Sequence, residues 1–210
     1  METQHQSLIE RVPLDAFLPY VIAGATLCPE SMALAYVRDT CIDFCVRSNT
    51  LRRRTVIDQQ CGVSDYPLWP DHDEQIVRVN EAHVNGTCYR GARDACCFEH
   101  GGARFTIRDG ALHISHDAAH DRPQAIEVRF TVSPTRRACE IDATLFDDWQ
   151  PAIADGTLAR LYMLPGYPFT APQLSLVRER AYNVAVNRAR IRSLKSDTGD
   201  TAMARGMPFL

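Results

Sequence analysis

The sequence predicts an α+β fold in which a helical bundle is interrupted by an antiparallel β insertion. Apolar residues recur at helical spacing in the first quarter of the chain, alternate with polar residues through the middle third, and return to helical spacing towards the C-terminus. The bundle would combine a first long helix with a C-terminal helix pair. We expect helical residues at 1–54 and 144–195, a β insertion at 55–143 and an extended C-terminal tail at 196–210.

The composition is that of an ordinary globular protein. Hydrophobic residues make up 45% of the 210-residue chain and charged residues 23%, which argues against extensive disorder. The first residues lack a basic segment followed by an apolar core, so no signal peptide is expected. No apolar run approaches the roughly 18 residues that a membrane span needs. In the cytoplasm that we expect as a result, the eight cysteines would be free thiols.

The first long helix is predicted at residues 29–49. Pro29 suits the first helical position, where its missing N–H has no partner to lose, and Glu30 is favourable beside the positive helix N-terminus. The Arg52–Arg54 run that follows is interpreted as a basic turn. The apolar stripe of the helix comprises Leu34, Val37, Cys41, Phe44 and Ser48.

Strand-like alternation follows this turn and predicts antiparallel strands with one face in water. Asn85 and Gly86 are favourable in a type I′ turn, and Asp109 with Gly110 suits the turn of a hairpin. Residues 87–102, rich in Gly, Cys and charge, are interpreted as a loop. Strands are expected at residues 55–60, 75–84 and 125–133, with a hairpin at 104–115.

The C-terminal helix pair is predicted from residue 145 onward. Pro151 is tolerated in a first turn, and Gly156 predicts a close crossing of two helices. Thr170 and Gln173 form a capping-box pattern that opens the last helix. The core stripe of that helix is predicted to comprise Leu174, Val177, Ala181, Val184 and Ala185, with the arginines lying off it.

The sequence contains no recognisable catalytic motif. A nucleophile elbow, a P-loop, a dinucleotide-binding glycine run and a zinc-protease HExxH are all missing, so we expect neither enzymatic activity nor a cofactor. Four residues of the glycine-rich segment could in principle bind zinc, but their spacing is poor and unpaired thiols are the favoured interpretation. These residues are Cys88, Cys96, Cys97 and His100.

Two stretches carry a family resemblance. The first reads PESMALAYVRD from Pro29 and closes with GVSDYPL at residues 62–68; the second reads FDDW from Phe146 and LPGYPFTAPQL at 164–174. Together they resemble the head-to-tail adaptor proteins of tailed bacteriophages and are similar to the tail tubular A proteins. The two stretches and their surroundings cover about half of the chain.

The resemblance implies a structural virion protein in the neck of the particle, assembled in the host cytoplasm. Such a protein would form a homo-oligomeric ring, a dodecamer, that joins the portal protein to a tail or nozzle protein. Its inner wall would contact packaged DNA non-specifically, and no membrane would be involved. Two alternatives stay open: another tail-completion or fibre-anchoring virion protein, and a nucleic-acid-binding protein that uses the basic C-terminal helix.

Two sites are expected. Arginine suits planar contacts to phosphate and carboxylate, and the resemblance would place the basic face of the last helix against the portal or the DNA channel. A plain solvated helix face is the alternative. The basic face comprises Arg178, Arg180, Arg188, Arg190, Arg192 and Lys195.

The second site is the C-terminal tail, where a polar tether ends on an apolar cluster that would suit a groove in a partner. The resemblance implies docking of this tail on the portal, whereas a frayed terminus is the alternative. The docking residues would be Arg205, Met207, Pro208, Phe209 and Leu210.

Overall fold

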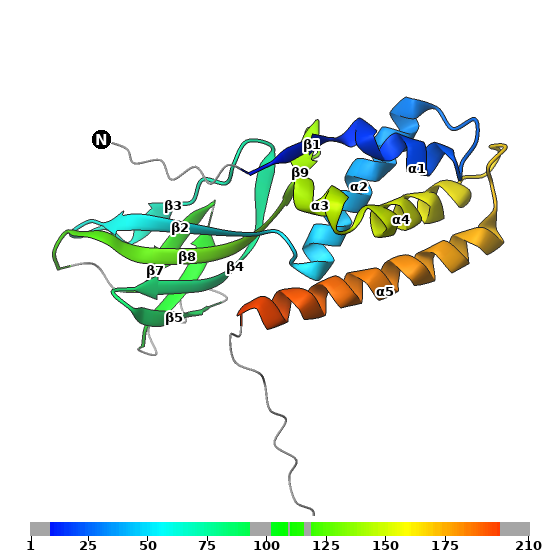
Figure 1. The fold of residues 1–210 in the computed structure, drawn as a ribbon. Helices are drawn as coiled ribbons and strands as arrows, with labels where there is room; N and C mark the ends of the chain where they lie inside the picture. Colours follow the sequence, from blue (N-terminus) through cyan, green and yellow to red (C-terminus); the bar gives the residue numbers. More distant parts are fainter. Residues whose placement is uncertain (1–8, 93–101, 109, 116–118, 198–210) are drawn as a thin grey trace, which may run out of the picture.

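The computed structural model describes residues 9–92, 102–108, 110–115 and 119–197. Figure 1 shows two parts side by side, a curled β-sheet and a group of helices. The sheet contains, in spatial order, β2 (Arg52–Gln59), β8 (Arg122–Pro134), β4 (Glu74–Val84), β5 (Thr87–Gly91), β6 (Arg104–Arg108), β7 (Ala111–Ile114) and β3 (Asp65–Pro67). The helical part contains η1 (Leu14–Phe17), α1 (Leu18–Ile22), α2 (Glu30–Ser48), α3 (Ala143–Asp147), α4 (Gln150–Tyr162) and α5 (Pro172–Asp197), with the small sheet of β1 (Arg11–Pro13) and β9 (Glu140–Asp142).

The prediction of a helical bundle interrupted by a β insertion is wrong. The sheet is a main body of an α+β fold, and its core is continuous with that of the helices. Ile126, Val128 and Phe130 of β8 are buried, and α2 packs directly against this strand. Strands also occur where none was expected, since the predicted basic turn at Arg52–Arg54 is the start of β2, and β1 pairs with β9 beside the helices. Long-range strand pairing therefore builds much of the common core.

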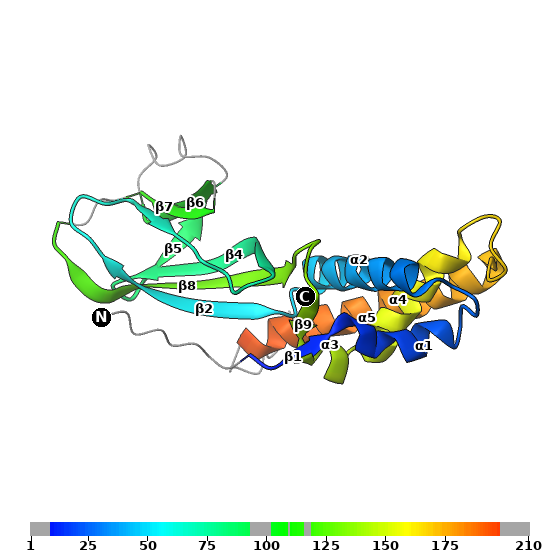
Figure 2. The ribbon, with the colours of Figure 1, turned by 90° about the horizontal axis from the view of Figure 1, so that it is seen from above.

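The sheet curls until its two edge strands approach each other. Gln60, directly after β2, donates its N–H to the Tyr66 hydroxyl of β3 at 3.3 Å, and that hydroxyl donates to the Val63 carbonyl at 2.8 Å. Figure 2 shows β6 and β7 on the far wall of this curl from β2. Buried Phe105 and Leu112 fill the interior from that wall. The result is a barrel-like sheet with a packed core.

Several local predictions are confirmed. The first long helix is α2, which begins one residue later than predicted, with Pro29 as its N-cap instead of its first residue and Asn49 closing it in the left-handed conformation. The cysteines that the structure describes are free thiols. Strand β4 coincides with the predicted strand at 75–84, β8 contains the one predicted at 125–133, and β6 pairs with β7 as an antiparallel hairpin.

Other local predictions are corrected. Part of the expected loop at 87–102 is strand β5, which pairs with both β4 and β6. The helix expected from residue 145 is two helices, because the Asp142 carboxylate accepts the Thr144 N–H at 2.8 Å and starts α3 earlier. A new helix, α4, then begins after Trp149.

Gly156 lies where α4 crosses its neighbours, as its position in the sequence predicted. A methyl group added there would come within 2.7 Å of the Tyr182 ring of α5 and within 2.8 Å of the Thr40 methyl of α2. The absence of a side chain at Gly156 therefore lets the three longest helices of the described chain meet closely.

One buried ion cluster joins the sheet to the helical part. The Arg53 guanidinium of β2 contacts Glu74 of β4 at 2.5 Å and Asp142 of β9 at 2.7 Å. The carboxylate side chains are only 4% and 8% exposed. Burial by itself would lower the pKa of Arg53, but hydrogen bonds and charge from both carboxylates outweigh burial and raise it. The cluster fixes β2 and β4 against the start of α3.

Candidate functional site

Helix α5 is attached to the protein through one face that carries small and hydroxyl-bearing side chains. Ser175 donates to the Ala159 carbonyl of α4 at 2.7 Å, and Ser193 donates to the Ser48 carbonyl of α2 at 3.0 Å. Between them, the Tyr182 hydroxyl donates to the Asp43 carboxylate of α2 at 2.7 Å. The buried residues of this inner face are Ser175, Tyr182, Val186, Ala189 and Ser193.

The predicted core stripe of α5 is wrong, because most of it faces solvent. Leu174, Val177 and Val184 are 54–62% exposed, and Ala181 is exposed as well. At 100° per residue these positions lie roughly opposite the inner face. The sequence carries two stripes at helical spacing, and the one with Tyr182 and the serines is buried. We call the opposite stripe the outer face of α5; its residues are Leu174, Val177, Ala181, Val184, Arg188 and Ile191.

The outer face has the spacing of a helix-packing surface. Its positions alternate steps of three and four residues, as the inward positions of coiled coils do. From Leu174 to Ile191 it extends about 26 Å along the helix, at 1.5 Å per residue. A helix that is apolar on opposite sides is typically covered on both. A contiguous exposed apolar surface rimmed by charge is typical of protein interaction sites.

The predicted basic face of α5 divides into two groups. Arg178 is held by Asp155 at 2.6 Å, and Arg192 by Asp148 at 2.9 Å, with its guanidinium 6.0 Å from the Trp149 ring centre. These two arginines stabilise the contact between α5 and the preceding helical segment. Arg180, Arg188 and Arg190 are exposed and form no ion pair with any residue that the structure describes. Lys195 is exposed at the end of the helix.

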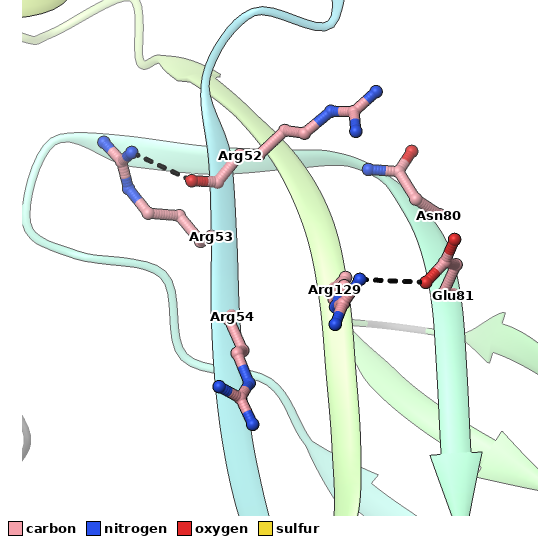
Figure 3. Close-up of a pocket in the computed structure, with 6 residues that line it drawn as sticks. All are labelled: Arg52, Arg53, Arg54, Asn80, Glu81 and Arg129. Carbon is pink, nitrogen blue, oxygen red and sulfur yellow. Dashed lines mark hydrogen bonds and ion pairs between the residues drawn. The ribbon is translucent and has the colours of Figure 1, made fainter. Parts of the chain in front are cut away.

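A second basic surface lies on the outer face of the sheet, where it was not predicted. Figure 3 shows Arg52 reaching across β8 towards Asn80 of β4, above Arg54 and Arg129. The hollow between these side chains measures about 230 Å³. We call it the sheet hollow; its lining residues are Arg52, Arg53, Arg54, Asn80, Glu81 and Arg129.

Acidic side chains partly neutralise the sheet hollow. Glu127 accepts Arg54 at 2.9 Å and Arg129 at 3.1 Å, and Glu81 lies 3.5 Å from Arg129. Slight burial would raise the pKa of Glu127, but the hydrogen bonds and charges of Arg54 and Arg129 outweigh burial and lower it. Glu127 and Glu81 therefore hold two of the arginines of the hollow, Arg54 and Arg129.

The two basic surfaces adjoin each other. The Arg52 guanidinium contacts the Ser193 hydroxyl at 3.4 Å, so the C-terminal end of α5 meets the start of β2. Period-two alternation was the signal that could have found the sheet hollow, since Arg53 points into the core whereas Arg52 and Arg54 point outward. Phosphates along a nucleic-acid backbone are the ligands that such an arginine surface suits.

The described part of the chain contains no cluster of side chains that could hold a metal ion. Within residues 9–92, 102–108, 110–115 and 119–197, no three His, Cys, Asp or Glu side chains gather around a common point. Cys88 is exposed on β5, whereas the other members of the predicted zinc group, Cys96, Cys97 and His100, lie outside the described residues. Burial raises the pKa of Cys41 to about 12, which keeps this thiol protonated and a poor nucleophile.

The predicted docking residues Arg205–Leu210 also lie outside the described residues. In the part of the chain that the structure covers, no helix combines the length and apolarity that crossing a bilayer requires. A scan against models of known protein families and a search of curated proteins both find no match to this chain.

Proposed function

We propose that the chain is a structural virion protein, a head-to-tail adaptor whose copies form a ring between the portal and the tail. The observation that carries the proposal is the outer face of α5. A 26-residue helix, about 39 Å long at 1.5 Å per residue, leaves four large apolar side chains more than half exposed on this face: Leu174, Val177, Val184 and Ile191. An exposed apolar face of this kind is typical of a surface that binds another protein, as an assembly of copies requires.

The family resemblance supplies the rest of the proposal. It gives the dodecameric ring, the portal protein on one side, the tail or nozzle protein on the other, and the position in the neck of the virion. The unpaired arginines of α5 and the sheet hollow support non-specific contact with DNA passing through the ring. Such contacts would be made to the phosphate backbone, would not read bases, and would weaken with salt.

Portal binding by the tail tests the proposal. The purified chain should co-sediment with portal rings of the same phage, and deletion of Arg205–Leu210 should abolish this while leaving the thermal midpoint unchanged. A matched control removes the exposed Met163 side chain, which belongs to neither proposed surface and should leave co-sedimentation intact. A full chain that stays in the supernatant would contradict portal docking, and a large loss of stability in the deletion would assign the tail to folding.

The sheet hollow favours one second candidate, a nucleic-acid-binding protein. Arg52, Arg54 and Arg129 would then bind duplex DNA without any virion partner, with an affinity that falls steeply as salt rises. Titration of labelled duplex at two salt concentrations separates the candidates. Tight, salt-sensitive binding without portal binding would favour the second candidate. Binding to tail components alone would instead indicate a tail-completion or fibre-anchoring protein.

A further inference from the structure

The connection between β3 and β4 presents the most exposed aromatic side chain that the structure describes. Trp69 is 82% exposed, although large aromatic side chains normally bury most of their surface. We call residues 68–73 the Trp69 loop. Exposed tryptophan is strongly enriched among residues that dominate the energetics of protein interfaces.

The backbone of the Trp69 loop is fixed on both sides of the exposed ring. The buried Leu68 donates its N–H to the Gly110 carbonyl at 3.1 Å, and Pro70 restricts the backbone immediately after the tryptophan. At the far end Glu74 donates to the Asp71 carbonyl at 3.0 Å, and the Asp73 carbonyl accepts Thr135 at 2.8 Å. A rigid loop loses little entropy when its side chain binds a partner.

The outer face of α5 contains a seat of suitable size. Ala181 and Ala185 are small, so the helix surface is hollowed beside Val184 and between Arg180 and Arg188. This α5 hollow measures about 350 Å³ and has an apolar floor with a guanidinium at each end. Arginine binds the face of an indole ring through cation–π attraction, which is strongest for tryptophan.

Charge on the two surfaces is complementary. The Trp69 loop carries Asp71, which is 46% exposed and only loosely paired with Arg11 at 3.9 Å, and Asp73, which lies 3.4 Å from the exposed His72 ring. Arg180 and Arg188 of the α5 hollow form no ion pair within the described residues. Carboxylates beside the indole would therefore meet guanidinium groups beside its seat.

The two surfaces cannot meet within one molecule. In Figure 1 the β3–β4 connection lies along the upper side of the molecule, next to β1, and α5 lies along the lower side. The Asp71–Arg11 contact confirms that the loop is beside β1, whereas α5 packs on α2 and α4. A contact between different surfaces of two copies is heterologous, and its repetition gives a closed ring or an open chain.

We propose that the Trp69 loop of one copy docks into the α5 hollow of a second copy, with the indole on Ala181, Val184 and Ala185 and its acidic neighbours facing Arg180 and Arg188. This contact needs neither portal nor DNA. It rests on the proposed ring of copies, but self-association in solution and binding to the portal are separate measurements, so failure of one can be distinguished from failure of the other.

Sedimentation velocity on the full chain, from about 1 to about 100 μM, tests the contact in a range suited to weak association. The unmodified chain should self-associate. Trp69→Ala should weaken association by at least about 30-fold, the size of a hot-spot loss, without changing the thermal midpoint, because the ring lies outside the core. Val184→Asp should do the same by placing a charge on the floor of the hollow.

Mixing the two variants gives the sharpest result. Each retains one intact surface, so an equimolar mixture of Trp69→Ala and Val184→Asp should form a one-to-one dimer and nothing larger. Arg188→Glu should weaken association, whereas Arg190→Glu, an exposed position on the same helix outside the hollow, is the matched control and should not. Three results would overturn the proposal: a chain that stays monomeric throughout, a Trp69→Ala variant that associates normally, or a variant mixture that stays monomeric.

Discussion

Replacing Arg53 with methionine should destabilise the fold strongly, although the change looks mild in volume. Arg53 compensates two buried carboxylates, and its removal would leave Glu74 and Asp142 without their cation. Breaking a buried ion pair from one side costs about 3–5 kcal/mol. Because the Arg53 side chain is still 17% exposed, we expect the lower end, about 3 kcal/mol. For a chain of this length that lowers the thermal midpoint by about 6–12 °C.

Arg54→Met is the matched control, since the two arginines are adjacent on β2 and point to opposite faces. Arg54 is 62% exposed, and among the described residues it forms an ion pair with Glu127 alone, so its loss should change the unfolding free energy by about 0–1 kcal/mol. Urea denaturation at pH 7 measures both variants. An Arg53→Met variant as stable as Arg54→Met would refute the assignment of the cluster as a compensated, buried one.

The pH dependence of Arg53→Met follows from the same cluster. Burial would raise the pKa of Asp142, but hydrogen bonds from Thr144 and Arg53 and the charge of Arg53 outweigh it and lower the pKa. A lowered carboxyl pKa adds stability above its ordinary value near 3.8, and this stability is lost as the pH falls through the folded value. Arg53→Met lacks this arginine. The difference in unfolding free energy between the variant and the unmodified chain should therefore be largest near neutral pH and should become smaller as the pH falls.

Two further perturbations probe the helical part. Gly156→Ala should lower the free energy of unfolding, measured by urea denaturation, by about 1–3 kcal/mol, because the new methyl group would overlap the Tyr182 ring and the Thr40 methyl. Helix propensity alone predicts a gain in stability instead, and such a gain would show that the helices can move apart at this crossing. Burial, with the hydrogen bond and charge of Asp43, raises the pKa of Tyr182, so the folded state favours the protonated phenol. The free energy of unfolding should therefore fall as the pH rises above about 10, and it should fall less in Tyr182→Phe. An equal fall in the variant and the unmodified chain would contradict this.

Local periodicity carried much of the secondary structure. The three- and four-residue spacing through Val37, Cys41 and Phe44 is sufficient to predict α2, since one side of that helix is apolar. Alternation through β8 likewise predicts both the strand and its buried face. These patterns depend only on residues that are close in the sequence, so they can be recognised without the structure.

The fold as a whole depends on pairings between distant residues. Strand β8 pairs with β2 on one side and β4 on the other, and no local pattern gives this order. The alternation of inward and outward residues at the start of β2 could not be recognised, because its inward residue is Arg53. An inward arginine is tolerated only beside carboxylates, and these come from the distant strands β4 and β9. The predicted helical bundle with a β insertion therefore assigned too little of the core to the sheet.

The candidate site shows the same limit. Helix α5 contains two stripes at helical spacing, and sequence alone favoured the more aliphatic one as core. The structure buries the stripe of Tyr182, Val186 and Ala189 instead, because its serines and tyrosine find acceptors on α2 and α4. Which of the two apolar stripes of α5 faces solvent therefore depends on the residues of α2 and α4, which are distant in the sequence.

Electron microscopy of the chain mixed with portal rings of the same phage tests the adaptor function most directly. At protein concentrations well above micromolar, negative-stain images should show a collar of added density that follows the symmetry of the portal. Bare portals beside free protein would contradict the adaptor function.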